Sequence, residues 1–156
     1  MTYFLQVKDR HNANILIDKA GHIIHIDYGY ILGERPNSEM LQSWALGQAP
    51  FKLTDEYVDL LDGPNSATFR QFEELFVAGF VAIRKHAGRV LCLLETFAST
   101  PAQKAALSAA MQQRLGGPSP PGGAEYFARC LVAESLGNSL TKAYDLYQQR
   151  FIGIAA

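Results

Sequence analysis

The sequence is poor in cysteine, in net charge and in long apolar segments, and each shortage argues against a class of function. Cys92 and Cys130 lie far apart among apolar residues, so we expect two buried thiols rather than a zinc site. Fourteen basic and fifteen acidic residues give a net charge of -1, which provides no bulk attraction to nucleic acid. No apolar run approaches the roughly 20 residues that cross a bilayer. Because no signal peptide follows Met1 either, we expect a soluble protein, at most peripheral on a membrane.

The composition is that of a folded protein of one domain or of a piece of a larger one. Hydrophobic residues make up 48% of the 156 residues and charged residues 19%, which suffices to bury a core. Short β-branched runs occur only near the N-terminus, and apolar residues at helical spacing dominate the remainder. We therefore predict an α+β fold that is mainly α.

A β-hairpin is predicted close to the N-terminus. The strand-like runs 15–17 and 22–26 are joined by Asp18-Lys19-Ala20-Gly21, which is typical of a turn. A strand-like apolar run, 3–7, and a polar cluster, 9–14, precede the hairpin, and Asp27 follows it. Because a hairpin returns the chain to its starting end, the two polar segments should lie together.

The C-terminal two thirds of the sequence are expected to be helical, around a segment rich in glycine and proline. That segment, 116–123, is predicted to be an exposed, flexible linker. The stripe from Phe69 to Phe80 should lie in the core, and core packing is the preferred interpretation for the stripe Tyr144, Tyr147 and Phe151. Helices are expected at 54–61, 66–86, 88–99, 100–115, 124–136 and 138–152.

The polar residues around the hairpin have the chemistry that phosphoryl transfer requires. Divalent cations such as Mg²⁺ or Mn²⁺ prefer carboxylate and amide oxygens, which Asp27 and Asn14 offer. A hydroxyl nucleophile needs a proton acceptor, for which Asp9 is the first candidate and His11 the second. The order of a loop aspartate, an asparagine and an Asp-Tyr-Gly triplet follows the catalytic logic of protein kinases.

The residue order then narrows the class of kinase. Protein kinases have His-Arg-Asp, whereas this chain has Asp9-Arg10-His11-Asn12, which resembles the catalytic loop of the phosphatidylinositol 3-/4-kinase superfamily. The similarity is closest to the type III phosphatidylinositol 4-kinases of the beta form. It extends over Gln6–Asn12, Gly21–Asp27, Pro50–Thr54, Ala82–His86 and Thr141–Asp145.

This resemblance implies a protein-kinase-like C-lobe and a role for each matching residue. It assigns Asp9, Arg10 and His11 to the catalytic loop and makes Asn14 and Asp27 metal ligands. Leu16 and Ile26 become the floor of the adenine pocket. The activation loop is implied at 27–53, where Tyr28, Gly29 and Lys52 would face the lipid substrate. ATP is the implied co-substrate, and the product is phosphatidylinositol phosphorylated at the inositol 4-position.

The charge of the activation loop gives a separate argument about the substrate. Its basic residues are Arg35 and Lys52, and its acidic residues between Gly29 and Thr54 are Glu34 and Glu39. A headgroup that already carries phosphate would require a basic cluster. Unphosphorylated phosphatidylinositol is therefore the better fit, although this loop does not distinguish the 4-position from the 3-position.

The eight residues before Asp9 leave no room for the parts that hold a nucleotide in kinases: a Gly-rich loop, a strand lysine and a helix glutamate. We therefore interpret residues 1–156 as a partial catalytic domain without its N-lobe, and expect it not to turn over alone. The missing N-terminal part becomes an expected partner, together with ATP and membrane phosphatidylinositol.

Three alternatives stay open: a non-catalytic interaction module, a phosphatidylinositol 3-kinase C-lobe, and a protein serine/threonine kinase of the same superfamily. The Pro50–Thr54 string and the long helical tail argue against the last of these. The family likeness suggests a cytoplasmic protein recruited to Golgi or other intracellular membranes.

Overall fold

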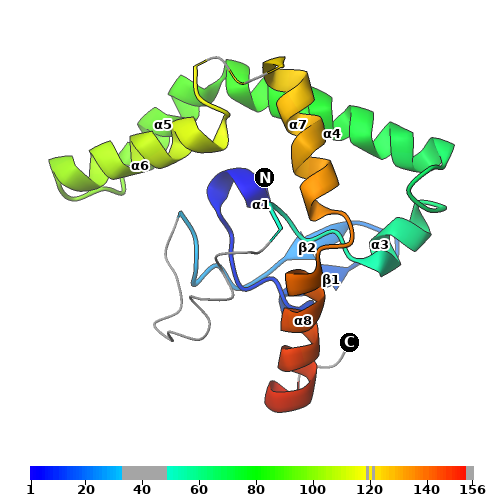
Figure 1. The fold of residues 1–156 in the computed structure, drawn as a ribbon. Helices are drawn as coiled ribbons and strands as arrows, with labels where there is room; N and C mark the ends of the chain where they lie inside the picture. The colour runs from blue at the N-terminus through cyan, green and yellow to red at the C-terminus, as the bar shows by residue number, and fades with distance from the viewer. Residues whose placement is uncertain (33–48, 119, 121, 154–156) are drawn as a thin grey trace. The chain divides into compact units, whose positions relative to one another are not determined.

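The chain forms two compact units, and most of its ordered structure is helical. The computed structural model describes residues 1–32, 49–118, 120 and 122–153 (Figure 1). Residues 1–55 and 134–156 make up the first unit, and residues 56–133 make up the second. Among the described residues, the single sheet has two strands, which confirms the expected α+β, mainly α composition.

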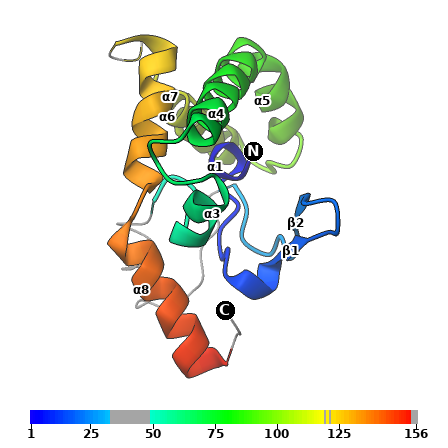
Figure 2. The same cartoon turned by 90° about the vertical axis from the view of Figure 1, so that its right-hand side faces the viewer.

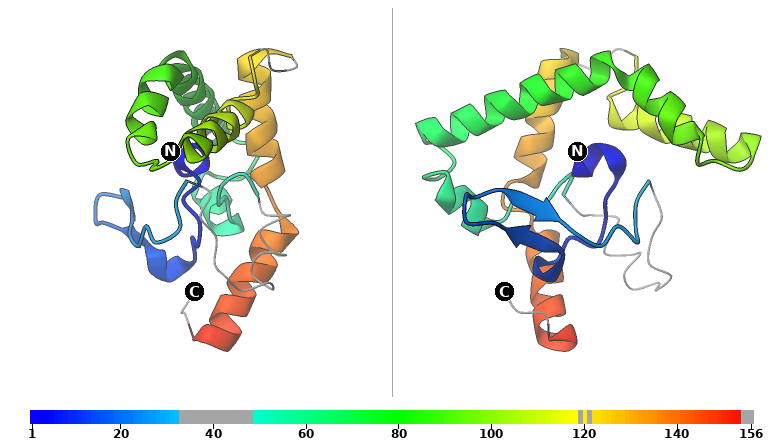
Figure 3. Two further views of the ribbon diagram at one scale, coloured as in Figure 1. Left: turned by 90° about the vertical axis from the view of Figure 1, so that its left-hand side faces the viewer. Right: turned by 180° about the vertical axis from the view of Figure 1, so that it is seen from behind.

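The predicted hairpin is present in the first unit (Figure 3). Strand β1 (Ile15–Ile17) pairs antiparallel with β2 (Ile23–His25). The Asp18 carboxylate closes the turn by accepting from the backbone N–H of Ala20 and of His22, and its other oxygen lies 2.8 Å from His22 Nδ1. The hydrogen bond from the His22 side chain is the largest cause of a lowered pKa at Asp18.

The N-terminal segment differs from its prediction. Instead of a strand, Thr2–Leu5 forms one helical turn, α1, which ends at Gln6 in the left-handed region with φ 51°. The turn buries Phe4, and Val7 is buried immediately after it. Beyond the turn, the backbone N–H of Lys8 donates to Tyr30, so that the segment before the catalytic loop lies beside the segment after the hairpin.

The helices of the chain follow the predicted ranges within a few residues. The first unit also holds α8 (Ser139–Tyr147), which continues into a π-helical turn, η2 (Gln148–Ile152); Figure 2 shows this helix from the side. The second unit contains α4 (Ala67–Lys85), α5 (Ala87–Glu95) and α6 (Pro101–Arg114). It also contains all but the first residue of α3 (Asp55–Leu60) and all but the last two residues of α7 (Gly123–Ser135).

The core of the second unit is built where α4 and α7 pack together. Phe69 and Phe80 are buried on α4, as predicted for the ends of this aromatic stripe, whereas Phe72 and Phe76 between them are only half-buried. The ring of Phe80 lies 5.7 Å from that of Phe127 on α7, and Arg129 of α7 donates to Glu73 at 2.6 Å. These apolar and ionic contacts fix the two helices to each other.

Other expectations about burial were wrong at particular residues. Cys92 is exposed and Cys130 is only half-buried. In the predicted aromatic stripe of the last helix, Tyr144 is buried, whereas Phe151 is 74% exposed and stacks on Tyr147 with a 5.2 Å centroid separation.

The glycine-rich segment begins with defined contacts. Gly116 and Gly117, which were expected to be exposed, are half-buried. The Arg84 guanidinium donates to the carbonyls of Leu115, Gly117 and Pro118, and thereby satisfies backbone acceptors at the end of α6. The activation-loop assignment at 27–53 falls mostly on residues 33–48, which lie outside the described residues. Within the described part of the chain, no helix is long and apolar enough to cross a membrane.

The start of α4 depends on one serine, which gives a direct test of the fold. Ser66 Oγ accepts from the backbone N–H of Phe69 at 2.8 Å and donates to the Leu61 carbonyl. We predict that Ser66→Ala lowers the free energy of unfolding by about 1 kcal/mol, measured by urea titration. Ser99→Ala is the control, since Ser99 is exposed and its backbone N–H, not its side chain, donates to Gln103. Equal stability of the two variants would contradict this role for Ser66, the N-cap residue of α4.

Candidate active site

Two aspartates frame the candidate site, and both have unusual backbone conformations. Asp9 and Asp27 each have φ 56°, in the left-handed region that residues other than glycine seldom adopt. Asp9 lies on the loop before η1 (Asn12–Asn14), and Asp27 follows β2. Such conformations persist where surrounding contacts enforce them, and they concentrate at functional sites.

Arg10 provides the contacts that hold the two segments together. Its guanidinium donates to the carbonyls of Lys8, Asn14, Ile26 and Asp27, with nitrogen–oxygen distances of 2.8 Å to Lys8 and to Ile26. Burial lowers the pKa of Arg10, and the Asp9 and Asp27 carboxylates act against this shift. Arg10 remains a cation, and its planar fork bridges the catalytic loop and the end of the hairpin.

The Arg10 guanidinium also lies over an aromatic ring. The ring of Tyr28 is 5.8 Å from the guanidinium carbon, and the Tyr28 hydroxyl donates to the His25 carbonyl at 2.9 Å. Because each of its contacts is to a backbone carbonyl or this ring, Arg10 acts on the site by positioning. The sequence placed Arg10 with the catalytic residues and Tyr28 with the substrate, and it missed their contact with each other.

Asn14 is held in one orientation by its neighbours. It is buried, and its Nδ2 donates to the Asp9 carbonyl at 3.0 Å and lies 3.3 Å from His11 Nε2. With the proton on Nδ1, the His11 ring accepts from Asn14 through Nε2. The same Nε2 is 3.8 Å from the Asp9 carboxylate. The amide nitrogen thus faces the catalytic loop, and the amide oxygen is the atom that remains for a cation.

Asp27 is exposed and presents its carboxylate from a tight turn. Its Oδ1 accepts from the Gly29 backbone N–H at 3.1 Å. A Cβ at position 29 would lie 3.3 Å from this oxygen, closer than side chains normally approach. The absence of a side chain at Gly29 therefore lets the turn close on the carboxylate, which gives a physical reason for the glycine in the Asp-Tyr-Gly triplet.

Leu16 and Ile26 lie on one face of the hairpin. Leu16 pairs with Ile24 across the sheet, and the Ile26 backbone N–H donates to the Asn14 carbonyl, which extends the pairing by one step. Residues two apart on a strand share a face. The side chains of Leu16, Ile24 and Ile26 are 47%, 46% and 38% exposed. An apolar surface of this kind beside two aspartates is suited to cover a flat, apolar ligand group.

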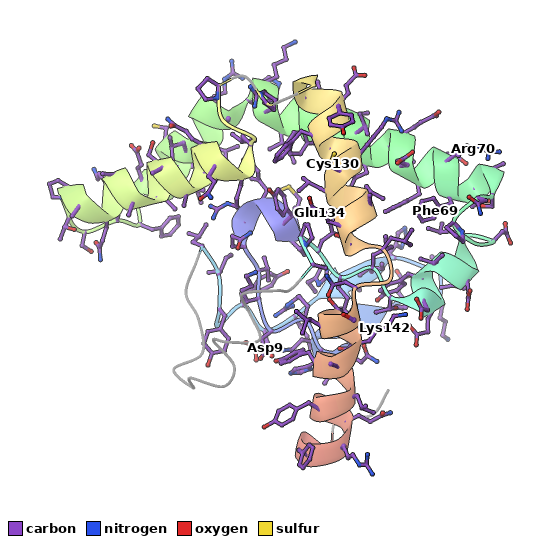
Figure 4. All side chains as sticks on the ribbon, viewed as in Figure 1. Asp9, Phe69, Arg70, Cys130, Glu134 and Lys142 are labelled. Atoms are coloured by element: carbon purple, nitrogen blue, oxygen red, sulfur yellow. The ribbon has the colours of Figure 1, made fainter. Side chains whose placement is uncertain are left out.

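Helix α8 reaches the same loop from a distant part of the sequence. The Tyr144 hydroxyl donates to Asp9 Oδ1 at 2.7 Å, and Figure 4 shows Asp9 beside this helix. The next residue, Asp145, forms an ion pair with Lys52, whose Nζ also donates to Asn12 Oδ1 at 2.9 Å. Lys52, assigned from sequence to substrate contact, is therefore engaged inside the protein. Sequence reasoning gave no function to Tyr144 or Asp145, although both lie in a string that carried the family resemblance.

Comparison with known proteins decides the class of the chain. The family model for phosphatidylinositol 3- and 4-kinases matches residues 1–106, more than half of the sequence. The chain belongs to the phosphatidylinositol 3-/4-kinase family. This finding confirms the resemblance that rested on the residue order around Asp9.

Curated relatives narrow the likeness to 4-kinases. The chain is 48% identical over 101 residues to a phosphatidylinositol 4-kinase of Dictyostelium discoideum, covering 65% of the chain and 8% of the relative. It is 37% identical over 152 residues to the Saccharomyces cerevisiae phosphatidylinositol 4-kinase PIK1, covering 94% and 14%. It is 47% identical over 93 residues to the Xenopus tropicalis phosphatidylinositol 4-kinase beta, covering 60% and 11%. The chain thus spans about a tenth of the length of these relatives.

The residues at the site fit the cation that this family implies. Asn14 and Asp27 offer one amide and one carboxylate group, both hard oxygen donors suited to Mg²⁺ or Mn²⁺. Among the described residues, no group of three or more histidine, cysteine, aspartate or glutamate side chains forms a metal cage. Two protein ligands are typical of a magnesium ion that is also held by substrate phosphates.

The bridging role of Arg10 predicts a specific loss on substitution. In Arg10→Lys a single ammonium group replaces the guanidinium group that donates to four carbonyls, so most of these hydrogen bonds are lost. We predict a loss of about 1 to 2 kcal/mol in unfolding free energy, because the site is partly exposed to solvent. Faster amide exchange should also appear at residues 14 and 26. Arg70→Lys is the control, since the exposed Arg70 bonds only to the Asn65 carbonyl in the described structure; a similar loss there would contradict the prediction.

His25 predicts a pH dependence of stability. Burial is the main cause of its lowered pKa, and the nearby Arg10 cation adds to the shift. A histidine with a lower pKa in the folded state binds protons more readily when unfolded, so stability falls as pH drops below about 6.5. We predict that His25→Gln flattens the loss of unfolding free energy between about pH 6.5 and pH 5. The exposed His86 supplies the control variant His86→Gln, which should leave the slope of the parent protein intact.

Proposed function

We propose that this chain forms the metal- and base-bearing half of the active site of a phosphatidylinositol 4-kinase. The observation that carries the proposal is the convergence of Asp9, Asn14 and Asp27 around the Arg10 guanidinium, in a chain of the phosphatidylinositol 3-/4-kinase family. ATP is the proposed phosphate donor. The proposed place of action is the cytoplasmic face of Golgi or other intracellular membranes.

Each residue of the site has a proposed task in phosphoryl transfer. Asp9 accepts the proton of the inositol hydroxyl, because its carboxylate lies on the loop that the hairpin brings to Asp27. His11 accepts from the Asn14 side chain through Nε2, 3.3 Å from Asn14 Nδ2, and so keeps the Asn14 amide in place. Asn14 and Asp27 would hold the divalent cation, and a bound cation would neutralise the negative charge of the ATP phosphates. Leu16 and Ile26 cover the adenine ring.

The pairing of Lys52 supports an inositol ring that carries no phosphate beyond the phosphodiester of the lipid. Arg35 and Lys52 are the two basic residues between positions 27 and 53, and of these Lys52 alone is described. Its side chain is 9% exposed and its charge is matched by Asp145. A headgroup that already carries phosphate would need accessible cations. The choice of the 4-position follows the names of the relatives and is part of the proposal.

A segment exchange tests this function without any assumption about the ends of the chain. The chain replaces the homologous segment of the yeast relative PIK1, and the purified chimera is given phosphatidylinositol vesicles, Mg²⁺ and radiolabelled ATP. We expect label in a lipid product whose phosphate is on the inositol 4-position, assigned by chromatography after deacylation. An inactive chimera, or label at the 3-position, would contradict the proposal.

Two substitutions in the chimera separate the base from the metal ligand. Asp9→Asn removes a proton acceptor and should lower kcat by about 100-fold or more at any Mg²⁺ concentration. Asp27→Asn weakens a cation ligand, so activity should fall and recover in part as Mg²⁺ or Mn²⁺ is raised. Asp59→Asn, on the exposed surface of α3, is the control and should keep full activity. Full activity of the Asp27 variant at low Mg²⁺ would refute its role as ligand.

A further inference from the structure

We propose that α8 positions the catalytic loop through two adjacent side chains, Tyr144 and Asp145. Tyr144 holds the Asp9 carboxylate, and Asp145 holds Lys52, which in turn holds Asn12. The catalytic meaning of this arrangement rests on the proposed function, whereas the contacts themselves can be tested without it. Tyr144 and Asp145 are thus positioning residues.

The bond from Tyr144 fixes the rotation of the Asp9 carboxylate. Tyr144 is 8% exposed, and its hydroxyl donates to Asp9 Oδ1 at 2.7 Å. The last torsion of an aspartate side chain is otherwise broad and nearly two-fold. With Oδ1 occupied by the phenol, Oδ2 is the oxygen that faces His11, at 3.8 Å from Nε2. Loss of the hydroxyl would let the carboxylate rotate while leaving the aromatic ring in the core.

The hydrogen bonds of Lys52 connect α8 and the catalytic loop to the end of the activation loop. Its Nζ lies 2.8 Å from Asp145 Oδ1 and 2.9 Å from Asn12 Oδ1, and the lysine side chain is 9% exposed. The pair is partly buried, since the Asp145 side chain is 27% exposed, and removing Asp145 would leave the Lys52 charge without its ionic partner. The pair therefore couples α8, the catalytic loop and the segment around Lys52.

The geometry of a helix explains how neighbouring residues reach two different segments. Consecutive residues project about 100° apart around the helix axis, so Tyr144 is directed to Asp9 while Asp145 is directed to Lys52. A neighbouring contact comes from the last residue of α7, where the Oγ of buried Ser135 accepts from the Phe51 backbone N–H at 3.3 Å. A displacement of α8 would release the Asp9 carboxylate and Lys52 together.

Hydrogen exchange of the full 156-residue chain tests the contact itself. Tyr144→Phe keeps the ring and removes the hydroxyl, so we expect amides at residues 9–14 to exchange about tenfold faster, the effect of losing one charge-assisted hydrogen bond. Tyr126→Phe, an exposed tyrosine of α7, is the matched control and should leave these amides unchanged. Unchanged exchange at residues 9–14 in Tyr144→Phe would overturn the proposal, whatever the kinase activity.

Kinetics in the yeast chimera distinguish positioning from a merely structural role. We expect Tyr144→Phe to lower kcat at least tenfold with the KM for ATP and for phosphatidylinositol unchanged, because the hydroxyl acts on Asp9 rather than on substrate binding. Asp145→Asn should lower kcat as well. Lys142→Gln is the control from the same helix, since its pair with Asp55 is exposed at both ends.

The possible results lead to separate conclusions. A normal kcat in Tyr144→Phe, or a loss matched by Lys142→Gln, would overturn the positioning role. An inactive parent chimera would instead reject the proposed function, and the exchange experiment on the chain would still decide whether Tyr144 holds the catalytic loop.

Discussion

The candidate site depends on the hydrogen bonds that the Arg10 guanidinium donates to backbone carbonyls. Two segments that carry the aspartates are separated by a hairpin, and their carbonyl groups converge on this one cation. A lysine offers a single point charge, but the planar fork of arginine matches several carbonyls at once. The hairpin brings the two segments to the same end, and Arg10 fixes how closely they meet. The positions of Asp9 and Asp27 follow from both.

Left-handed backbone at both aspartates is a second sign of this enforced geometry. Asp9 and Asp27 share φ 56°, and neither has the freedom of glycine. The bond from Asn14 Nδ2 to the Asp9 carbonyl stabilises one, and the turn from Asp27 Oδ1 to Gly29 stabilises the other. Strain of this kind persists when several contacts oppose its relief. The Gly29 N–H also aims the Asp27 carboxylate, whereas the Asp9 carboxylate is held by the Tyr144 hydroxyl.

The sequence predicted local features well and long-range contacts poorly. The hairpin and the helix starts at Ser66 and Thr100 follow from alternation, capping and periodicity, which act within a few residues. Tyr144 is 135 positions from Asp9, and no local pattern marks their contact. For the same reason, local patterns did not anticipate the partners of Arg10, assigned to the catalytic loop, or of Lys52, assigned to substrate contact. Which charge a lysine meets is decided by the fold.

The pairing of Lys52 links the stability of the site to the chemistry proposed for it. A lysine at the end of the activation loop would attract phosphate if its charge were open to solvent. Asp145 neutralises that charge, and Asn12 takes another of its hydrogens. The residue that would favour a phosphorylated headgroup instead fastens the catalytic loop to α8. If the proposed function holds, this ion pair has two effects. It keeps α8 against the catalytic loop, and it leaves the substrate surface suited to an inositol ring without an added phosphate.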